Sequence, residues 1–143
     1  MATWLTPHFC LEELTATQQR NQDNGPPAEV VAVLRSTAQR MEHVRELLGG
    51  RVVTVNSGYR SAAVNRAVGG AKTSAHLSGH AVDFTCHRFG SPLEVSRTIA
   101  ASDLVFDQLI DEGAWVHLSF APASRRQVLT RRPGGGFAVG LRA

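Results

Sequence analysis

The stretch Ser74-Ala75-His76-Leu77-Ser78-Gly79-His80-Ala81-Val82-Asp83 is the most informative part of the sequence. Two of its side chains, His76 and Asp83, belong to residue types that bind metals well. His76 lies in a segment of loop composition, whereas Asp83 lies in residues 80–85, which predict a strand. Gly79 between them lets the backbone turn sharply, so both side chains can converge on one point. Taken singly, such a histidine is usually structural and such an aspartate usually caps a turn.

A predicted hairpin farther along the chain supplies a third candidate ligand, His117. Residues 104–110 and 115–120 have the composition of two strands, and residues 111–114, Asp-Glu-Gly-Ala, have that of a hairpin loop. Successive side chains of a strand alternate between its two faces. The side chains on one face of the second strand are therefore expected to pack in the core, and the other face carries His117.

These three side chains together suit a catalytic zinc ion. Such a site needs three nitrogen or oxygen ligands from rigid elements and an open fourth position for water. His76, Asp83 and His117 provide that set from a loop and two separate strands. His80 and His87 remain as alternative ligands, because spacing alone does not exclude either of them.

The remaining sequence predicts helices alternating with short strands. Apolar residues spaced three or four apart predict an amphipathic helix over residues 27–48, ended by two glycines. Three more elements follow from β-branched residues or helix caps: a strand at 52–55, a short helix from Ser61 to Val68, and a helix capped by Ser91 that runs to about Ala101. The pattern predicts an α+β fold, with a small antiparallel sheet flanked by helices.

The length and composition predict one domain. A chain of 143 residues with 43% hydrophobic and 19% charged residues has room for a single core. No apolar run approaches the roughly 20 residues of a membrane span. Residues 122–143 are basic and glycine-rich and are expected to form a last strand or a loose tail. The start of the chain lacks the features of a secretory signal, so synthesis in the cytoplasm is expected.

The charge pattern favours no nucleic-acid partner. The formal net charge is only +3, and the late arginines have no interleaved aromatic residues on which bases could stack. These arginines are Arg125, Arg126, Arg131 and Arg132. Two cysteines, Cys10 and Cys86, are expected to be free thiols because neither belongs to a Cys-x-x-Cys pair. Two further histidines, His8 and His43, are expected at the surface.

Several motifs, in order along the chain, carry a resemblance to a known family. They are Ser57-Gly58-Tyr59-Arg60-Ser61, Asn65, Val68-Gly69-Gly70, Ser74-x-His76-x-x-Gly79-x-Ala81-x-Asp83 and Trp115-Val116-His117. Over about residues 5–121 the sequence resembles the D-alanyl-D-alanine carboxypeptidase-like zinc peptidases, a group that includes phage endolysins and is related by fold to hedgehog domains. The resemblance implies a Zn²⁺-dependent peptidase of bacterial cell-wall peptidoglycan, either a carboxypeptidase or an endopeptidase of the stem peptide or cross-bridge.

The same resemblance assigns roles to residues around the metal. It implies that His76, Asp83 and His117 are the ligands, and that Arg60 and Ser74 line the substrate cleft. A guanidinium there can bind a substrate carboxylate or stabilise charge on the scissile carbonyl. Two aromatic residues of the matching motifs, Tyr59 and Trp115, are further candidates for substrate contact.

The general acid and base departs from the family pattern. In relatives it usually lies three residues before the last histidine ligand, where this sequence has Ala114. Glu112 in the same predicted turn is the hypothesis for this role, with Asp111 as the runner-up, because a carboxylate must relay a proton to the leaving amine. Hairpin pairing is also expected to place Gln108 opposite His117, within reach of substrate.

Two other classes of function compete with the wall peptidase. A metal-binding module without catalysis is compatible with Ala114, and a basic nucleic-acid binder is compatible with the charge. Peptidoglycan peptides are the expected partners, and a monomer is the expected state. A product made in the cytoplasm would reach the wall during host lysis or from a virion, as phage lysins do.

Overall fold

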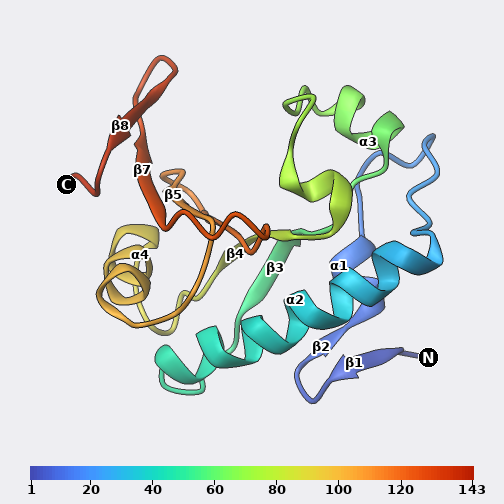
Figure 1. Cartoon of the computed structure of the whole chain (residues 1–143), viewed down its shortest axis with the longest axis horizontal. Coiled ribbons are helices and arrows are strands. Elements are labelled where there is room, and N and C mark those ends of the chain that lie inside the picture. The colour runs from blue at the N-terminus through green and yellow to red at the C-terminus, as the bar shows by residue number, and fades with distance from the viewer.

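The computed structural model describes residues 1–143 as a mixed α+β fold (Figure 1). The helices are α1 (Leu11–Thr15), α2 (Ala28–Leu47), α3 (Ala62–Ala67) and α4 (Pro92–Ala101), with one 3₁₀ turn, η1 (Ala75–Ser78). The strands are β1 (Trp4–Thr6), β2 (Phe9–Cys10), β3 (Thr54–Ser57), β4 (Ala81–Thr85), β5 (Gln108–Asp111), β6 (Val116–Ser119), β7 (Gln127–Arg131) and β8 (Phe137–Val139). The α+β class predicted from the sequence is confirmed.

The main sheet has six strands in the order β3-β4-β6-β5-β7-β8, and β1 and β2 form a separate antiparallel pair. The expectation of a purely antiparallel sheet is wrong, because β5 and β7 pair in parallel. β6 runs antiparallel to β5 and returns the chain, and the segment between β6 and β7 then passes the start of β5, so that β7 lies on its other side. The basic end of the chain is therefore part of the sheet and forms a hairpin of β7 and β8 (red in Figure 1).

Helix α2 covers the core because its apolar residues fall on one side. Its buried apolar side chains are Val30, Leu34, Ala38, Met41 and Val44. Burying a valine, leucine or methionine side chain contributes about 1.5–3 kcal/mol relative to exposure. The helix ends at Leu47, just before Gly49 and Gly50, both of which have positive φ. Such a conformation favours glycine and terminates the helix.

The cap predicted for α4 is present. Ser91 accepts a hydrogen bond from the backbone N–H of Glu94, and the Glu94 carboxylate accepts one from the backbone N–H of Ser91. Pro92 follows at the first helical position, where no N–H donor is needed. The helix then packs on β5 and β6 through the buried Val95 and Ile99.

The two faces of β4 and β6 differ in character. The core face carries four fully buried side chains: Val82, Phe84, Val116 and Leu118. The opposite face carries Asp83 and His117, which are directly opposite each other in the antiparallel register. Side chains alternate along a strand, so a single residue step separates the hydrophobic core from the polar site.

The register of the β5–β6 hairpin differs from the sequence expectation. Ile110, not Gln108, lies opposite His117, and Gln108 pairs with Ser119. The strand β5 is shorter than expected because residues 104–107 are not in the sheet, and the loop tip moves toward residues 112–115. Gln108 still lies on the face that bears His117, two residue pairs farther along.

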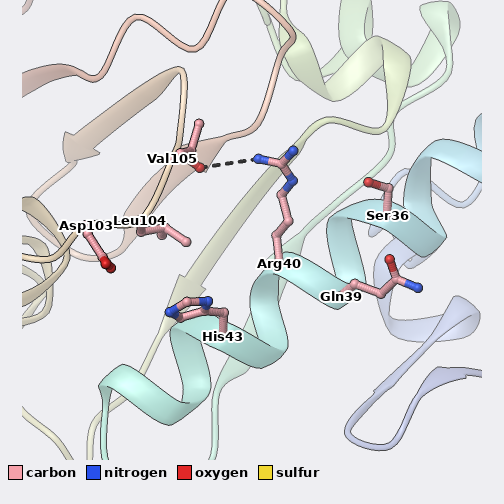
Figure 2. A pocket seen from close by; sticks show the side chains of 7 residues that line it. All are labelled: Ser36, Gln39, Arg40, His43, Asp103, Leu104 and Val105. Atoms are coloured by element: carbon pink, nitrogen blue, oxygen red, sulfur yellow. Dashed lines mark hydrogen bonds between the residues drawn. The ribbon is translucent and has the colours of Figure 1, made fainter.

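A shallow hollow lies between α2 and the segment that leads into β5 (Figure 2). Ser36, Gln39, Arg40 and His43 line it on the helix side, and Asp103, Leu104 and Val105 on the other. The Arg40 guanidinium crosses the hollow and donates a hydrogen bond to the carbonyl of Val105 at 3.3 Å. This contact ties the segment before β5 to α2.

The other expectations of the sequence concern thiols and membranes. Cys10 and Cys86 are both free, as expected. Among the helices, α2 included, none combines the length and the apolar character that crossing a bilayer requires. Whether residues 1–143 form one domain stays a prediction, as does the hedgehog-like description of the fold.

Candidate metal centre

The side chains of His76, Asp83 and His117 converge on one point. The Asp83 Oδ1 atom lies 3.2 Å from Nε2 of His76 and 2.8 Å from Nδ1 of His117. One donor atom from each residue lies within 4.8 Å of the others. His76 comes from the turn η1, and the other two residues come from adjacent strands of the sheet. The three residues predicted as ligands are therefore brought together.

The ring of His76 is oriented by the backbone. Its Nδ1 atom lies 2.6 Å from the carbonyl of Gly58, which can only accept a hydrogen bond. This contact places the ring proton on Nδ1 and leaves the Nε2 lone pair directed at the site, as in most metal-bound histidines. Gly58 is required there, because a Cβ atom at this position would lie 2.4 Å from the carbonyl oxygen of Leu14.

The turn η1 ends at a residue whose conformation requires glycine. Gly79 has φ of +83°, and it lies between the two ligands from the predicted loop and strand. Its carbonyl accepts a hydrogen bond from the hydroxyl of Thr37 on α2. The sharp change of direction predicted from the sequence is thus present and fixed to the core.

Asp83 is an anion that its neighbours stabilise. Burial alone would raise the pKa of this carboxyl, but its contacts with the imidazole rings of His117 and His76 lower the pKa far below its usual range. The Arg60 guanidinium adds a third contact, 3.4 Å from Asp83 Oδ2. The carboxylate is therefore charged over the physiological pH range, as a metal ligand must be.

Arg60 has more partners within the protein than the sequence suggested. It donates to the Ser57 hydroxyl through Nε and to the Asn65 side-chain oxygen through Nη1, both at 3.3 Å. Together with its contact to Asp83, these bonds make it a residue that positions a ligand. The guanidinium also lines a small cavity of about 270 Å³ with Gln18. A contact with substrate in that cavity stays a prediction.

Asn24 is a site residue that the sequence analysis missed. Its side-chain amide donates to the carbonyls of Thr15 and Tyr59, and its side-chain oxygen accepts from the backbone N–H of Ser61. These bonds fix both ends of the turn that carries Arg60. The only local signal was an asparagine followed by glycine and two prolines. This composition predicts a turn, and does not predict hydrogen bonds from the Asn24 side chain to distant backbone groups.

The donor set fits a zinc ion. Tetrahedral zinc with bonds of about 2.0–2.2 Å separates its ligand atoms by about 3.3 Å, close to the distances from Asp83 to the two histidines. Two imidazoles and one carboxylate leave a fourth position for water or substrate. The two imidazole rings pack edge to face, with centroids 5.1 Å apart.

Comparison with known proteins agrees with this geometry. The family model described as Peptidase M15 matches residues 7–119. The chain belongs to the peptidase M15 family. A zinc D-Ala-D-Ala carboxypeptidase of Streptomyces albus G is 43% identical over 47 residues, which are 33% of this chain and 18% of that relative. The match spans less than a fifth of the relative, whereas the family match includes all three ligands.

Glu112 of this M15 chain lies near two of the ligands, His117 and Asp83, and Asp111 is held elsewhere. Burial raises the pKa of the half-buried Glu112 carboxyl, and the charges of His117, Asp83 and Arg131 also act on it. Asp111 is buried, and its Oδ1 accepts a hydrogen bond from the backbone N–H of Gly113. Asp111 thus shapes the loop, while Glu112 has the free carboxylate.

Two predicted substrate contacts have structural duties in this M15 chain. Ser74 caps η1, where its hydroxyl accepts from the backbone N–H of His76. Tyr59 is only 7% exposed and belongs to the hydrophobic core, although its edge lines the cavity beside Arg60. Neither observation tests a role in substrate binding, so both assignments stay predictions.

The remaining two candidates lie on the metal-bearing face of the sheet. Gln108 donates a hydrogen bond from Nε2 to the side-chain oxygen of Gln127 at 2.8 Å. Trp115 is half-buried, and its ring N–H is buried without a partner. Substrate contact by Gln108 and Trp115 stays a prediction.

The other histidines lie outside the cluster. His80 contacts the Ser78 hydroxyl through Nδ1, and burial together with the charge of Arg40 lowers its pKa. His87 is exposed, and so is His43. His8 is at the surface and pairs with Glu42. The cluster of three ligands contains none of these four residues.

Proposed function

We propose that the chain is a zinc-dependent peptidase that hydrolyses peptide bonds in bacterial cell-wall peptidoglycan. The observation that carries the proposal is the convergence of His76 Nε2, His117 Nδ1 and the Asp83 carboxylate beside Glu112. Membership of the peptidase M15 family supports it. The similarity to a zinc D-Ala-D-Ala carboxypeptidase supports the choice of metal and of wall peptides as substrate.

A zinc ion in this site would act as a Lewis acid that activates water and polarises the scissile carbonyl. The chain's own residues supply the rest. The ligands His76, Asp83 and His117 would hold the ion. Glu112 would take a proton from the attacking water and deliver it to the nitrogen of the leaving amine, so that one water is consumed per bond cut. Its raised pKa suits a group that accepts and then donates a proton.

Arg60 would act in two ways. It keeps the Asp83 carboxylate charged and oriented through its contact with Oδ2. The part of its guanidinium that lines the cavity with Gln18 would bind a substrate carboxylate or the oxygen of the scissile carbonyl.

The proposal extends to the setting in which the enzyme works. It would act as a monomer on the cell wall, and a phage lysin released during host lysis or carried by a virion is the setting we favour. The hedgehog-like assignment of the fold belongs to the same proposal. A sheet with its core on one face and the metal ligands on the other supports it.

The test is the digestion of purified peptidoglycan and of defined muropeptides, followed by mass spectrometry of the released fragments. Fragments should appear with the zinc-loaded protein, disappear with a chelator and return when zinc is added. Release of D-alanine alone identifies a carboxypeptidase, and shortened stem peptides identify an endopeptidase. Zinc binding without any turnover would instead favour the metal-binding module, whose support is Ala114 at the usual acid position.

A further inference from the structure

The metal-bearing face of the sheet continues beyond the ligands onto the β7–β8 hairpin. Residues directly opposite one another in paired strands point to the same face. His117 lies opposite Ile110, Ile110 opposite Leu129, and Leu129 opposite Val139. The row that contains the ligands Asp83 and His117 therefore runs across the sheet to the edge strand β8.

A second row on the same face lies two residues farther along, about 7 Å away. In this row the backbone N–H of Glu112 donates to the carbonyl of Trp115 at 3.0 Å. The parallel register ends with Asp111 opposite Thr130, and the next residue of each segment is Glu112 and Arg131, whose charge acts on Glu112. Arg131 in turn lies opposite Phe137. Trp115, Glu112, Arg131 and Phe137 thus form one row next to the ligands.

Arg131 is free to bind a ligand, in contrast to two other arginines of the basic segment. Arg125 forms a two-bonded ion pair with Asp107, and Arg126 donates to the carbonyls of Ser102 and Leu104. The side chain of Arg131 is exposed and makes no hydrogen bond or ion pair. Its charge nevertheless reaches the site, because it is one of the influences that lower the pKa of Glu112.

The hairpin is attached rigidly enough to serve as a binding surface. Four consecutive residue pairs join β7 to β5 in parallel. The Arg125 guanidinium and its backbone N–H bind Asp107 at the entrance to β5, so the connection to β7 is fixed as well. The family model ends at residue 119, so the hairpin lies outside the part of the chain matched to the peptidase M15 family.

We propose that Arg131, with the exposed ring of Phe137 beside it, binds a carboxylate of the peptide substrate and makes the β7–β8 hairpin a specificity surface for acidic peptides. This inference rests on the proposed function. A guanidinium without an acceptor of its own binds a carboxylate with two parallel hydrogen bonds. Phe137 is 48% exposed and offers an apolar surface for the aliphatic part of the same residue.

The sheet geometry gives the place of that carboxylate in the substrate. Strands are spaced by about 4.8 Å, so β7 lies about 10 Å from β6, which carries His117. An extended peptide advances about 3.3 Å per residue. The carboxylate that Arg131 binds therefore belongs to about the third residue from the scissile bond, on the side away from Arg60.

The experiment measures binding of short peptides to the zinc-loaded Glu112→Gln variant by calorimetry. The peptides carry glutamate at the second, third or fourth residue from the scissile bond, and a matched series carries glutamine. Arg131→Ala should weaken binding of the third-position glutamate peptide about fivefold, the size of one exposed ion pair. The glutamine series should bind equally well to both proteins. Arg132→Ala, which removes a neighbouring exposed arginine, is the matched control and should change nothing.

The outcomes separate this inference from the proposed function. If Arg131→Ala binds every peptide as the parent does, or weakens both series equally, the carboxylate assignment is wrong even if the enzyme cleaves peptidoglycan. If the protein cleaves no wall peptide but binds acidic peptides through Arg131, the proposed function fails and the binding surface stands. If it neither cleaves wall peptides nor binds the acidic series, both are wrong. Equal zinc content in the variants excludes an indirect effect through the metal.

Discussion

The pair β4–β6 and the hairpin β7–β8 belong to the same sheet but have opposite surroundings. All five residues of β4 are buried, and so are three of the four residues of β6. In β8 only Ala138 is buried, while Phe137 and Val139 are exposed. Two of the three ligands, Asp83 and His117, thus lie on strands that cannot shift without disturbing the core. The exposed side chains of the hairpin can change at little cost in stability. If the hairpin binds substrate as we propose, specificity can vary while the metal site stays fixed.

The largest effect should follow from removing a ligand on the buried pair. His117→Ala leaves two of three donors, so zinc affinity should fall by at least about 100-fold and peptidase activity should be lost. Thermal stability in zinc should fall as well, because a metal that binds only the folded state stabilises it. Metal analysis and thermal unfolding with and without zinc measure both effects. A variant that holds as much zinc as the parent would show that His117 is not a ligand.

Glu112, in the loop that leads into β6, should matter for the rate nearly as much as a ligand does. Glu112→Gln should lower kcat by about 10²–10⁴-fold while zinc content and stability stay unchanged, because the amide cannot carry the proton. Asp111→Asn is the matched control, since an amide oxygen can still accept the hydrogen bond from Gly113. Single-turnover cleavage of a defined muropeptide gives the rates. Near-parent activity of Glu112→Gln would move the role to another acid.

Two phenylalanines compare the regions directly. Phe84→Ala in β4 removes a fully buried ring and should cost about 3–5 kcal/mol of unfolding free energy. Phe137→Ala in β8 removes an exposed ring and should change stability by less than about 0.5 kcal/mol. Denaturant unfolding of both variants measures the difference. Similar losses in the two would contradict the description of the hairpin as a peripheral surface.

Arg60→Ala should have an intermediate effect at the opposite side of the site. The substitution removes the guanidinium that contacts Asp83, so zinc affinity should fall about 10–100-fold, as for other groups that orient a ligand. Turnover at saturating zinc should fall too if the guanidinium also binds substrate. Arg60→Lys keeps the charge but loses the three separate contacts. Unchanged zinc affinity in Arg60→Ala would leave substrate binding as its sole role.

The smallest effect concerns the attachment of the hairpin and depends on pH. The hydrogen bond from Arg125 lowers the pKa of Asp107, although burial opposes this. The pair therefore adds stability above the ordinary aspartate pKa of about 3.9 and loses it as pH falls through the lowered pKa. Arg125→Ala should lower Tm by at most about 4 °C at pH 7, and the difference should vanish at low pH. A constant difference at all pH values would mean that packing, not charge, is responsible.

The sequence predicted the features that depend on neighbouring residues. The caps Ser61 and Ser91 are local hydrogen bonds to residues three positions away, and both are present. The convergence of His76 and Asp83 was predicted because the two residues are only seven positions apart and Gly79 between them allows a sharp turn. His117 was predicted from alternation in its strand together with the family resemblance.

The features that sequence reasoning missed depend on contacts between distant segments. The predicted register of β5 against β6 was wrong, because the length of the loop, and not its composition, decides which residues lie opposite each other. The parallel pairing of β5 with β7 depends on the return of the chain through β6 and on an ion pair between Asp107 and Arg125, which are eighteen residues apart. Arg60 was expected to serve only substrate, because its contact with Asp83 spans 23 residues.

The brace made by Asn24 has a consequence for how the protein ages. Asparagine followed by glycine is the dipeptide most prone to deamidation, in which the glycine nitrogen attacks the side-chain carbonyl. Here the Gly25 N–H is held by Asp23, and the Asn24 amide is bonded to two carbonyls, so the folded protein resists the reaction. Once converted to aspartate, residue 24 would face those same carbonyls with a negative charge. Samples that have unfolded and refolded slowly should therefore accumulate molecules in which residue 24 no longer holds the turn at Tyr59 and Ser61 that carries Arg60.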